Sequence, residues 1–273
     1  MDERGVIPSL FGVSRALIGM IHVGALPGSP SSLLSVEALA ESAVREARTL
    51  REAGFHGLLI ENMHDRPYLR GTAPPETVAA MAVVAREVRR DNSLPLGVQI
   101  LAAANREALA AALASGATFI RAEAFVFAHV ADEGVLQASA GELLRYRRAL
   151  GADGVRVFAD VKKKHSAHAI TADVSLVETA RAAEFFLADG VIVTGGATGQ
   201  AADPSEVAAA SGAVAIPTLV GSGITPENVA RYASADGFIV GSALKRDGVW
   251  SNPLDGARVG AMARAFERWE SRV

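Results

Sequence analysis

The chain has 273 residues, of which 50% are hydrophobic and 21% charged, and a formal net charge of −3. This length suits one α/β barrel or two small domains, and the near-neutral charge gives no electrostatic argument for a nucleic-acid partner. Because the chain contains no cysteine, disulfides, thiolate nucleophiles and thiolate metal sites are excluded. The apolar run at residues 16–23 is too short to cross a membrane, and no basic segment precedes it. We therefore expect a cytoplasmic protein without a transmembrane segment or a signal peptide.

Short apolar runs alternate with amphipathic stretches along the whole chain. The apolar runs end in polar or glycine-rich groups and predict buried strands at residues 17–23, 57–62, 95–101, 118–123, 155–161, 189–194, 217–220 and 236–240. The stretches between them predict helices at residues 35–54, from 74 or 75 to 88, and at residues 105–115, 141–150, 173–188 and 203–210, a short helix opened by residues 225–227, and a closing helix within residues 254–273. Residues 125–138 are predicted to form a long loop.

Eight strand–helix units are the number found in a (β/α)₈ barrel, which typically has about 250 residues. No linker or low-complexity tract divides the chain, so we expect one α/β domain over residues 1–273, a TIM barrel. A doubly wound open sheet is the alternative. It would lack the final closing unit and would place the glycine loops at one switch point of the sheet.

The fifth predicted strand ends in a run of charge. Since alternate residues of a strand share a face, Asp160, Lys162 and Lys164 are expected to point the same way, into the mouth of the barrel. We interpret Asp160 and Lys162 as a catalytic pair, with Lys162 stabilising an oxyanion, donating a proton or forming a Schiff base. A solvated lysine run at a surface strand end is the alternative.

The active site of a barrel lies at the C-terminal ends of its strands, and we take the polar residues there as candidates. Besides Asp160 and Lys162, the predicted catalytic residues are Glu61 and His22. The predicted substrate-binding residues are Asn62, Gln99, Arg121, Glu123, Lys164, His165 and Thr194. Glu61 follows an apolar run, so it is a buried base, an acceptor for a ligand hydroxyl, or a partner of Arg66, Arg70 or Arg121 in a salt bridge.

Glycine loops follow the last three predicted strands. Glycine lets backbone N–H groups approach phosphate oxygens, and consecutive loops after strands seven and eight form the usual phosphate site of a barrel. The predicted phosphate-binding residues are Gly196, Thr198, Gly199, Gly221, Ser222, Gly223, Gly241 and Ser242. The alternative is that these glycines only make tight turns.

Two cofactors are compatible with this mouth. A divalent metal could be bound by His22, His165 and His168 together with Glu61, Glu123 and Asp160, although their spacing matches no metal motif. The phosphate site could alternatively hold flavin mononucleotide, which would colour the purified protein yellow.

The same stretches resemble the BtpA family, known as photosystem I biogenesis proteins. The resemblance covers nearly the whole chain and rests on residues 18–30 (IGMIHVGALPGSP), 57–67, 159–166 (ADVKKKHS), 190–199 and 220–225 (VGSGIT). It implies a phosphate-binding (β/α)₈ barrel. The family takes its name from a photosystem phenotype, but members also occur where no photosystem does, and some are labelled as nucleosidases or placed near sugar uptake.

We therefore expect an enzyme acting on a small phosphorylated metabolite, a sugar phosphate or a nucleoside phosphate, by lyase, isomerase or nucleosidase-type chemistry. The rival hypothesis is a non-catalytic assembly factor for a photosystem. It predicts an exposed apolar or basic patch away from the mouth, and the sequence shows no obvious one. Because barrels of this kind often associate, we also expect a homo-oligomer.

Overall fold

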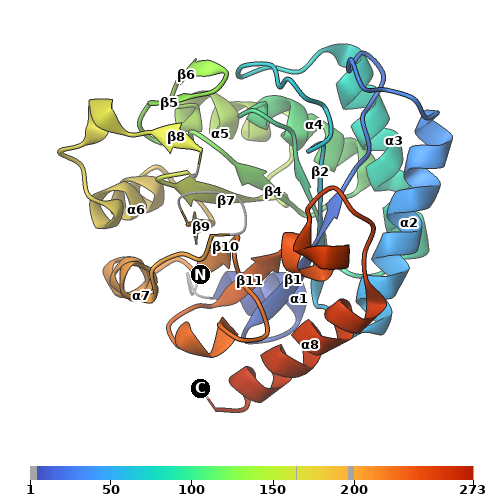
Figure 1. The fold of residues 1–273 in the computed structure, drawn as a ribbon. Coiled ribbons are helices and arrows are strands. Elements are labelled where there is room, and N and C mark those ends of the chain that lie inside the picture. Colours follow the sequence, from blue (N-terminus) through green and yellow to red (C-terminus); the bar gives the residue numbers. More distant parts are fainter. Residues whose placement is uncertain (1–4, 164, 196–199, 273) are drawn as a thin grey trace.

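A computed structural model describes residues 5–163, 165–195 and 200–272. Eight parallel strands form a closed barrel in the order β1-β11-β10-β9-β7-β4-β3-β2 (Figure 1). They are β1 (Ala16–His22), β2 (Gly57–Glu61), β3 (Leu96–Gln99), β4 (Phe119–Ala122), β7 (Arg156–Val161), β9 (Gly190–Val193), β10 (Thr218–Gly221) and β11 (Gly237–Val240). Because β1 pairs with β11, the sheet has no open edge. The predicted barrel is confirmed, and the open doubly wound sheet is wrong.

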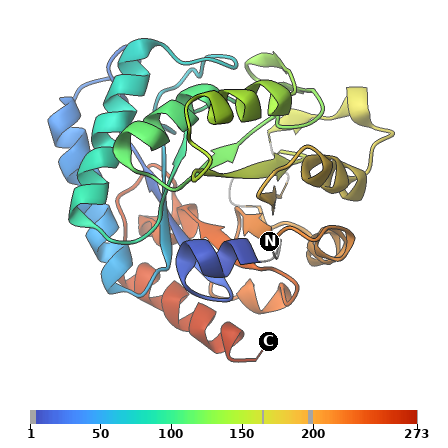
Figure 2. The ribbon, with the colours of Figure 1, turned by 180° about the vertical axis from the view of Figure 1, so that it is seen from behind.

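A ring of helices surrounds the barrel (Figures 1 and 2). They are α2 (Val36–Glu52), α3 (Pro75–Asp91), α4 (Asn105–Ser115), α5 (Ala140–Ala149), α6 (Leu176–Phe185), α7 (Pro204–Ala213) and α8 (Gly256–Glu270). Their starts follow local capping rules. The Ser35 hydroxyl accepts from the Ala38 amide at 3.2 Å, Ser175 and Glu178 form a capping box, and Asp203 caps α7 just before its Pro204.

Three segments differ from the sequence prediction. Residues 125–138 do not form only a loop: β5 (His129–Ala131) and β6 (Gly134–Leu136) make a hairpin, which β8 (Ser166–Ala167) extends to a small antiparallel sheet. The segment after Thr225 is not an α-helix but the 3₁₀ turn η3 (Val229–Arg231), because Asn228 folds its side chain back onto the Thr225 amide and the Gly223 carbonyl. An additional helix, α1 (Val6–Phe11), precedes β1.

Three further 3₁₀ turns lie in the βα loops: η2 (Ala169–Thr171), η4 (Ser242–Leu244) and η5 (Arg246–Gly248). Among the described residues, no helix is long and apolar enough to cross a membrane.

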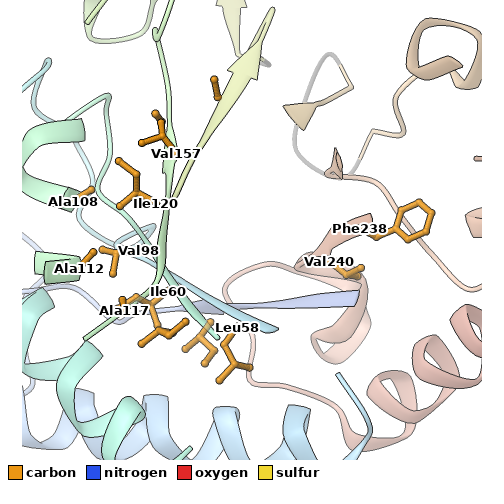
Figure 3. Close-up of a cluster of buried hydrophobic side chains, with 14 of the residues drawn as sticks. Leu58, Ile60, Val98, Ala108, Ala112, Ala117, Ile120, Val157, Phe238 and Val240 are labelled. Carbon is orange, nitrogen blue, oxygen red and sulfur yellow. The ribbon is translucent and has the colours of Figure 1, made fainter. Parts of the chain in front are cut away.

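The barrel wall separates two apolar layers. One set of strand residues, including Leu58, Val98 and Val157, faces the surrounding helices (Figure 3). The alternate set, which includes Leu59, fills the barrel interior. The lower end of the interior is closed by α1, whose Phe11 ring lies 5.6 Å from that of Phe119.

The same alternation places the polar strand ends. In a strand, the side chain two residues after an interior apolar residue again points into the barrel. Leu59, Phe119 and Phe158 are therefore followed by inward-facing polar side chains at the C-terminal end of the barrel. These are Glu61, Arg121 and Asp160.

Candidate functional site

A cavity of about 170 Å³ opens at the C-terminal ends of the strands, and we call it the mouth cavity. Its walls come from both sides of the barrel. One side supplies His22, Glu61 and Arg121 from β1, β2 and β4. The other side consists of the loops after β10 and β11, and its lining residues include Ser222, Gly223, Ile224, Thr225, Gly241, Ser242 and Ala243. The structure thus brings four of the eight predicted phosphate-binding residues, Ser222, Gly223, Gly241 and Ser242, together with three of the predicted polar groups.

The loop after β10 turns sharply at the wall of this cavity. Ser222 has φ 93° and Gly223 has φ 68°, so both adopt left-handed backbone, which is uncommon for a serine. A Cβ at Gly223 would come within 2.2 Å of the Gln200 backbone, so only glycine fits there. Backbone held in this unusual conformation at a cavity wall is a feature of functional sites.

Gly221 and Gly241 make room for side chains rather than for a ligand alone. A Cβ on Gly241 would lie 3.3 Å from His22 Nε2, and one on Gly221 would lie 3.7 Å from the Arg121 guanidinium carbon. Gly221 lies beside the cavity but does not line it. Because Gly221 and Gly241 carry no side chain, Arg121 can lie close to Gly221 and His22 can lie close to Gly241.

Arg258 was not predicted, and it lines the mouth cavity next to the β11 loop. It lies in the first turn of α8, and its Nε donates to the Ala243 carbonyl at 2.9 Å. None of the ion pairs found among the described residues involves Arg258. No sequence pattern marks Arg258 as a site residue, because an arginine in an amphipathic helix is ordinarily a solvated surface residue.

His22 and Glu61 form a close pair at the centre of the mouth. His22 Nε2 lies 3.7 Å from Glu61 Oε2, and His22 Nδ1 lies 3.0 Å from the Trp250 carbonyl oxygen. A carbonyl oxygen only accepts, so Nδ1 carries a proton and Nε2 faces the carboxyl group.

Arg121 and Asp160 form a buried ion pair below the cavity. Arg121 donates three hydrogen bonds to the Asp160 carboxylate, at 3.0 to 3.2 Å, and both residues are about 5% exposed. Burial alone would lower the pKa of Arg121, but the carboxylates of Asp160, Glu61 and Glu123 outweigh it and raise that pKa. Arg121 is thus a fixed positive charge on the cavity wall, and Asp160 holds it in place.

The predicted Asp160–Lys162 pair is wrong. The backbone leaves the extended conformation at Lys162, where φ is 48°, and Lys162 Nζ donates to the Thr171 carbonyl at 3.0 Å. Lys163 turns inward instead, and its Nζ lies 3.0 Å from Glu123 Oε1. Burial lowers the pKa of Lys163, but Glu123 more than compensates, so that pKa is raised.

Glu123 anchors the β3–β4 side of the site. It accepts hydrogen bonds from Gln99 Nε2 at 3.2 Å and from the Ala103 amide at 2.8 Å. Because a carboxylate only accepts, Gln99 must direct its amide nitrogen to Glu123, and its Oε1 is buried without a partner among the described residues. Neither Gln99 nor Glu123 lines the mouth cavity.

The remaining predicted residues lie outside the cavity or outside the described residues. Asn62 accepts from the Leu101 amide and donates to Asp65, so it fixes loops and lines a neighbouring pocket of about 250 Å³. His165 is exposed, whereas Thr194 is buried beside Gly221. Four predicted residues lie outside the described residues: Lys164, Gly196, Thr198 and Gly199. Among the residues that the structure describes, no three His, Asp or Glu side chains are grouped as metal ligands.

The fold and the site define a (β/α)₈ barrel with a polar cavity at its mouth, and comparison with known proteins assigns the chain more closely. The model of the BtpA family matches residues 13–268, so the chain belongs to that family.

Two relatives show how widely the family is distributed. A Caenorhabditis elegans protein whose name includes the word mitochondrial is 49% identical, with 95% of this chain and 96% of that one aligned. The photosystem I biogenesis protein BtpA of Synechocystis is 34% identical, over 94% of this chain and 89% of that one. Among solved structures, thiamine phosphate pyrophosphorylase from Pyrococcus furiosus has a TM-score of 0.56 at 16% identity and covers 94% of this chain and 98% of its own. That likeness shows the fold.

Proposed function

We propose that the protein is an enzyme acting on a small metabolite that carries a phosphate group, and that both binding and chemistry take place in the mouth cavity. One observation carries this proposal: a single cavity joins the β10 and β11 loops to His22, Glu61 and Arg121. Loops after the last two strands of a barrel commonly bind phosphate, and the C-terminal mouth holds the chemistry.

The electrostatics of the loop side support a phosphate. Backbone N–H groups and the hydroxyls of Ser222 and Ser242 offer hydrogen-bond donors to an anion, and Arg258 adds a positive charge without an ion-pair partner among the described residues. A guanidinium can donate two parallel hydrogen bonds to a phosphate group. The cavity therefore offers both the donors and the charge that a phosphate monoester requires.

The opposite side of the cavity supports acid–base chemistry. With its Nδ1 fixed by the Trp250 carbonyl, His22 can exchange the Nε2 proton with a substrate, and Glu61 stabilises the charged imidazolium. Arg121 can stabilise an oxyanion that forms nearby. Such a set suits a lyase or an isomerase. In a nucleosidase-type hydrolase, Glu61 would instead activate the attacking water.

Calorimetric titration with inorganic phosphate, ribose 5-phosphate and nucleoside monophosphates tests this proposal. We expect wild-type protein to bind at least one of them, and Arg258→Gln to weaken binding about tenfold or more, because one charge-assisted contact contributes roughly 1.5–3 kcal/mol. Arg145→Gln removes an exposed arginine from α5, far from the mouth, and should leave affinity unchanged. No binding of any phosphate compound by the wild-type protein would contradict the proposed function.

A second candidate function is supported by a different feature. Phe185, Phe186 and Leu187 at the C-terminal end of α6 are 82%, 48% and 70% exposed, and they form an apolar patch that was not obvious in the sequence. Such a patch is typical of a protein-contact surface, and the Synechocystis relative is named for photosystem I biogenesis.

Complementation of a strain that lacks the gene for this protein distinguishes the enzyme from the assembly factor. An assembly factor should keep its biological activity when His22 is replaced by Gln and lose it when Phe185 and Leu187 are replaced by Ser. An enzyme should show the opposite pattern.

A further inference from the structure

A large hollow lies away from the mouth. It is a groove of about 970 Å³ on the outer surface between α2 and α3. We call it the α2–α3 groove. Its floor is made of small apolar side chains, namely Val36, Ala40, Val44, Ala79, Ala80 and Val83. Because most of these side chains are short, the two helices do not fill the space between them. Val83 is 47% exposed there.

The rim of the groove carries five acidic and two basic side chains. The two arginines are already paired, Arg48 with Asp91 and Arg90 with Glu87. The other three acids, Glu37, Glu41 and Glu76, lie in the N-terminal part of the two helices, at the mouth end of the barrel, and of these Glu41 forms an exposed ion pair with Arg45 at 3.9 Å. The groove therefore favours an occupant with small apolar residues at one end and positive charge at the other.

The outer face of α8 has that composition. The side opposite its buried Met262 and Phe266 carries Ala257, Gly260 and Ala261 in its first half, and Arg264 and Arg268 in its second half, with the exposed Glu267 at the edge of that side. No contact among the described residues requires glycine at 260, because a Cβ there would meet only the tip of the Arg264 side chain. Glycine inside a helix costs about 0.5–1 kcal/mol relative to alanine, so a close approach from outside is a reason for its presence.

The two surfaces are neighbours on one face of the barrel. Helix α8 packs beside α2 (Figures 1 and 2), and Lys245, just before α8, pairs with Glu46 of α2 at 2.8 Å. A two-fold axis that passes through this face, perpendicular to the barrel axis, makes the helices of the second copy run antiparallel to those of the first. It therefore brings Arg264 and Arg268 of each copy to the acidic end of the other copy's groove, and the small residues to the other end. Both contacts form at once, as an isologous interface requires.

We propose that the α8–α2–α3 face is the interface of a two-fold symmetric homodimer, in which α8 of each copy lies in the α2–α3 groove of the other. The lengths agree: α8 is about 22 Å long, and α2 and α3 are about 25 Å each, at 1.5 Å per residue. This inference is independent of the proposed chemistry, because neither surface contributes the catalytic groups of the mouth.

Charge reversal tests the interface and its geometry together. A groove-reversed variant carries Glu37→Arg and Glu41→Arg, and a helix-reversed variant carries Arg264→Glu and Arg268→Glu. Native mass spectrometry and light scattering should show a wild-type dimer, and each reversed variant alone should have half that mass. Mixing the two variants should restore a dimer, because both contacts of the mixed pair then join opposite charges.

A chain with all four substitutions should also dimerise with itself, which separates loss of the interface from loss of folding. Arg145→Glu on α5, outside this face, is the control and should leave the dimer intact. A wild-type protein that is monomeric at all concentrations would overturn the proposal. So would reversed variants that stay dimeric alone, or variants that remain monomeric after mixing.

Discussion

At the scale of single residues, the mouth depends on charges that are buried in pairs. Asp160 has no solvent-exposed side-chain surface, and its carboxylate receives three hydrogen bonds from Arg121. Such a pair adds little net stability when both partners are present, but removing one leaves an uncompensated charge in the interior. Asp160 is thus expected to act as the support of Arg121 rather than as a reacting group.

Replacing Asp160 by Asn should lower the free energy of unfolding by about 3–5 kcal/mol, the usual cost of breaking a buried pair. The matched control is Asp153→Asn. Its partner Arg148 is 82% exposed, and an exposed pair contributes about 1 kcal/mol or less. Urea unfolding of both variants measures the difference. Equal losses would show that the Arg121–Asp160 pair does not carry the assigned energy.

The direction in which a side chain points at the mouth could be predicted only as far as its strand stays extended. Alternation along β7 predicted that Asp160 points inward, and the polar ends of β2 and β4 marked Glu61 and Arg121 as residues of the mouth. The same rule failed one residue after β7, because Lys162 adopts φ 48° and Lys163 takes the inward place. Turns with left-handed backbone at non-glycine residues have no clear sequence signal. Arg258 could not be predicted either, because its position depends on how α8 packs beside the β11 loop.

At the scale of elements, the small β5–β6–β8 sheet buries a histidine over the β4–β7 side of the mouth. His129 is 5% exposed, its ring lies 5.5 Å from that of His168, and its Nε2 has no hydrogen-bond partner among the described residues. Burial, with Lys163 and His168 nearby, lowers the pKa of His129 to about 4. This histidine is therefore neutral in the folded protein at neutral pH.

Stability should consequently fall as the pH is lowered from 6.5 towards 4. In this window the unfolded chain, with a histidine pKa of 6.5, binds a proton that folded His129 does not bind, so unfolding becomes easier as protons are added. The difference amounts to at most about 3 kcal/mol. His129→Gln should flatten the pH profile of the unfolding free energy in this range. His56 and His64 also have lowered pKa values, so a residual slope is expected. Parallel profiles for the variant and the wild type would contradict the assignment.

Elements with strong local signals were predicted closely. Helix α4 has the predicted bounds, and α2 and α7 begin directly after Ser35 and Asp203, where their helices were predicted to start. The β5–β6 hairpin was missed because its strands are three residues long and are stabilised by pairing with β8, far away in the sequence. The local sequence pattern contains no signal for a contact between segments so far apart.

At the scale of the whole molecule, the barrel could be predicted because its signal is repeated eight times. Each unit alone is ambiguous, but eight apolar strands in regular alternation with helices admit few arrangements. The association of two barrels is not marked by any comparable repeated signal in the sequence. Arg264 and Arg268 look like ordinary solvated residues of α8 until the acidic α2–α3 groove is seen on the same face.

The small antiparallel sheet also limits how the protein can be altered. The βα loops of a barrel are usually independent, so one can be lengthened, shortened or exchanged without regard to the others. Here the loop after β4 supplies β5 and β6, and the loop after β7 supplies β8, which pairs with β5 through Val130 and Ala131. An insertion or exchange in either loop would shift the register of the other. In evolution and in loop grafting, these two loops should therefore change together as one module.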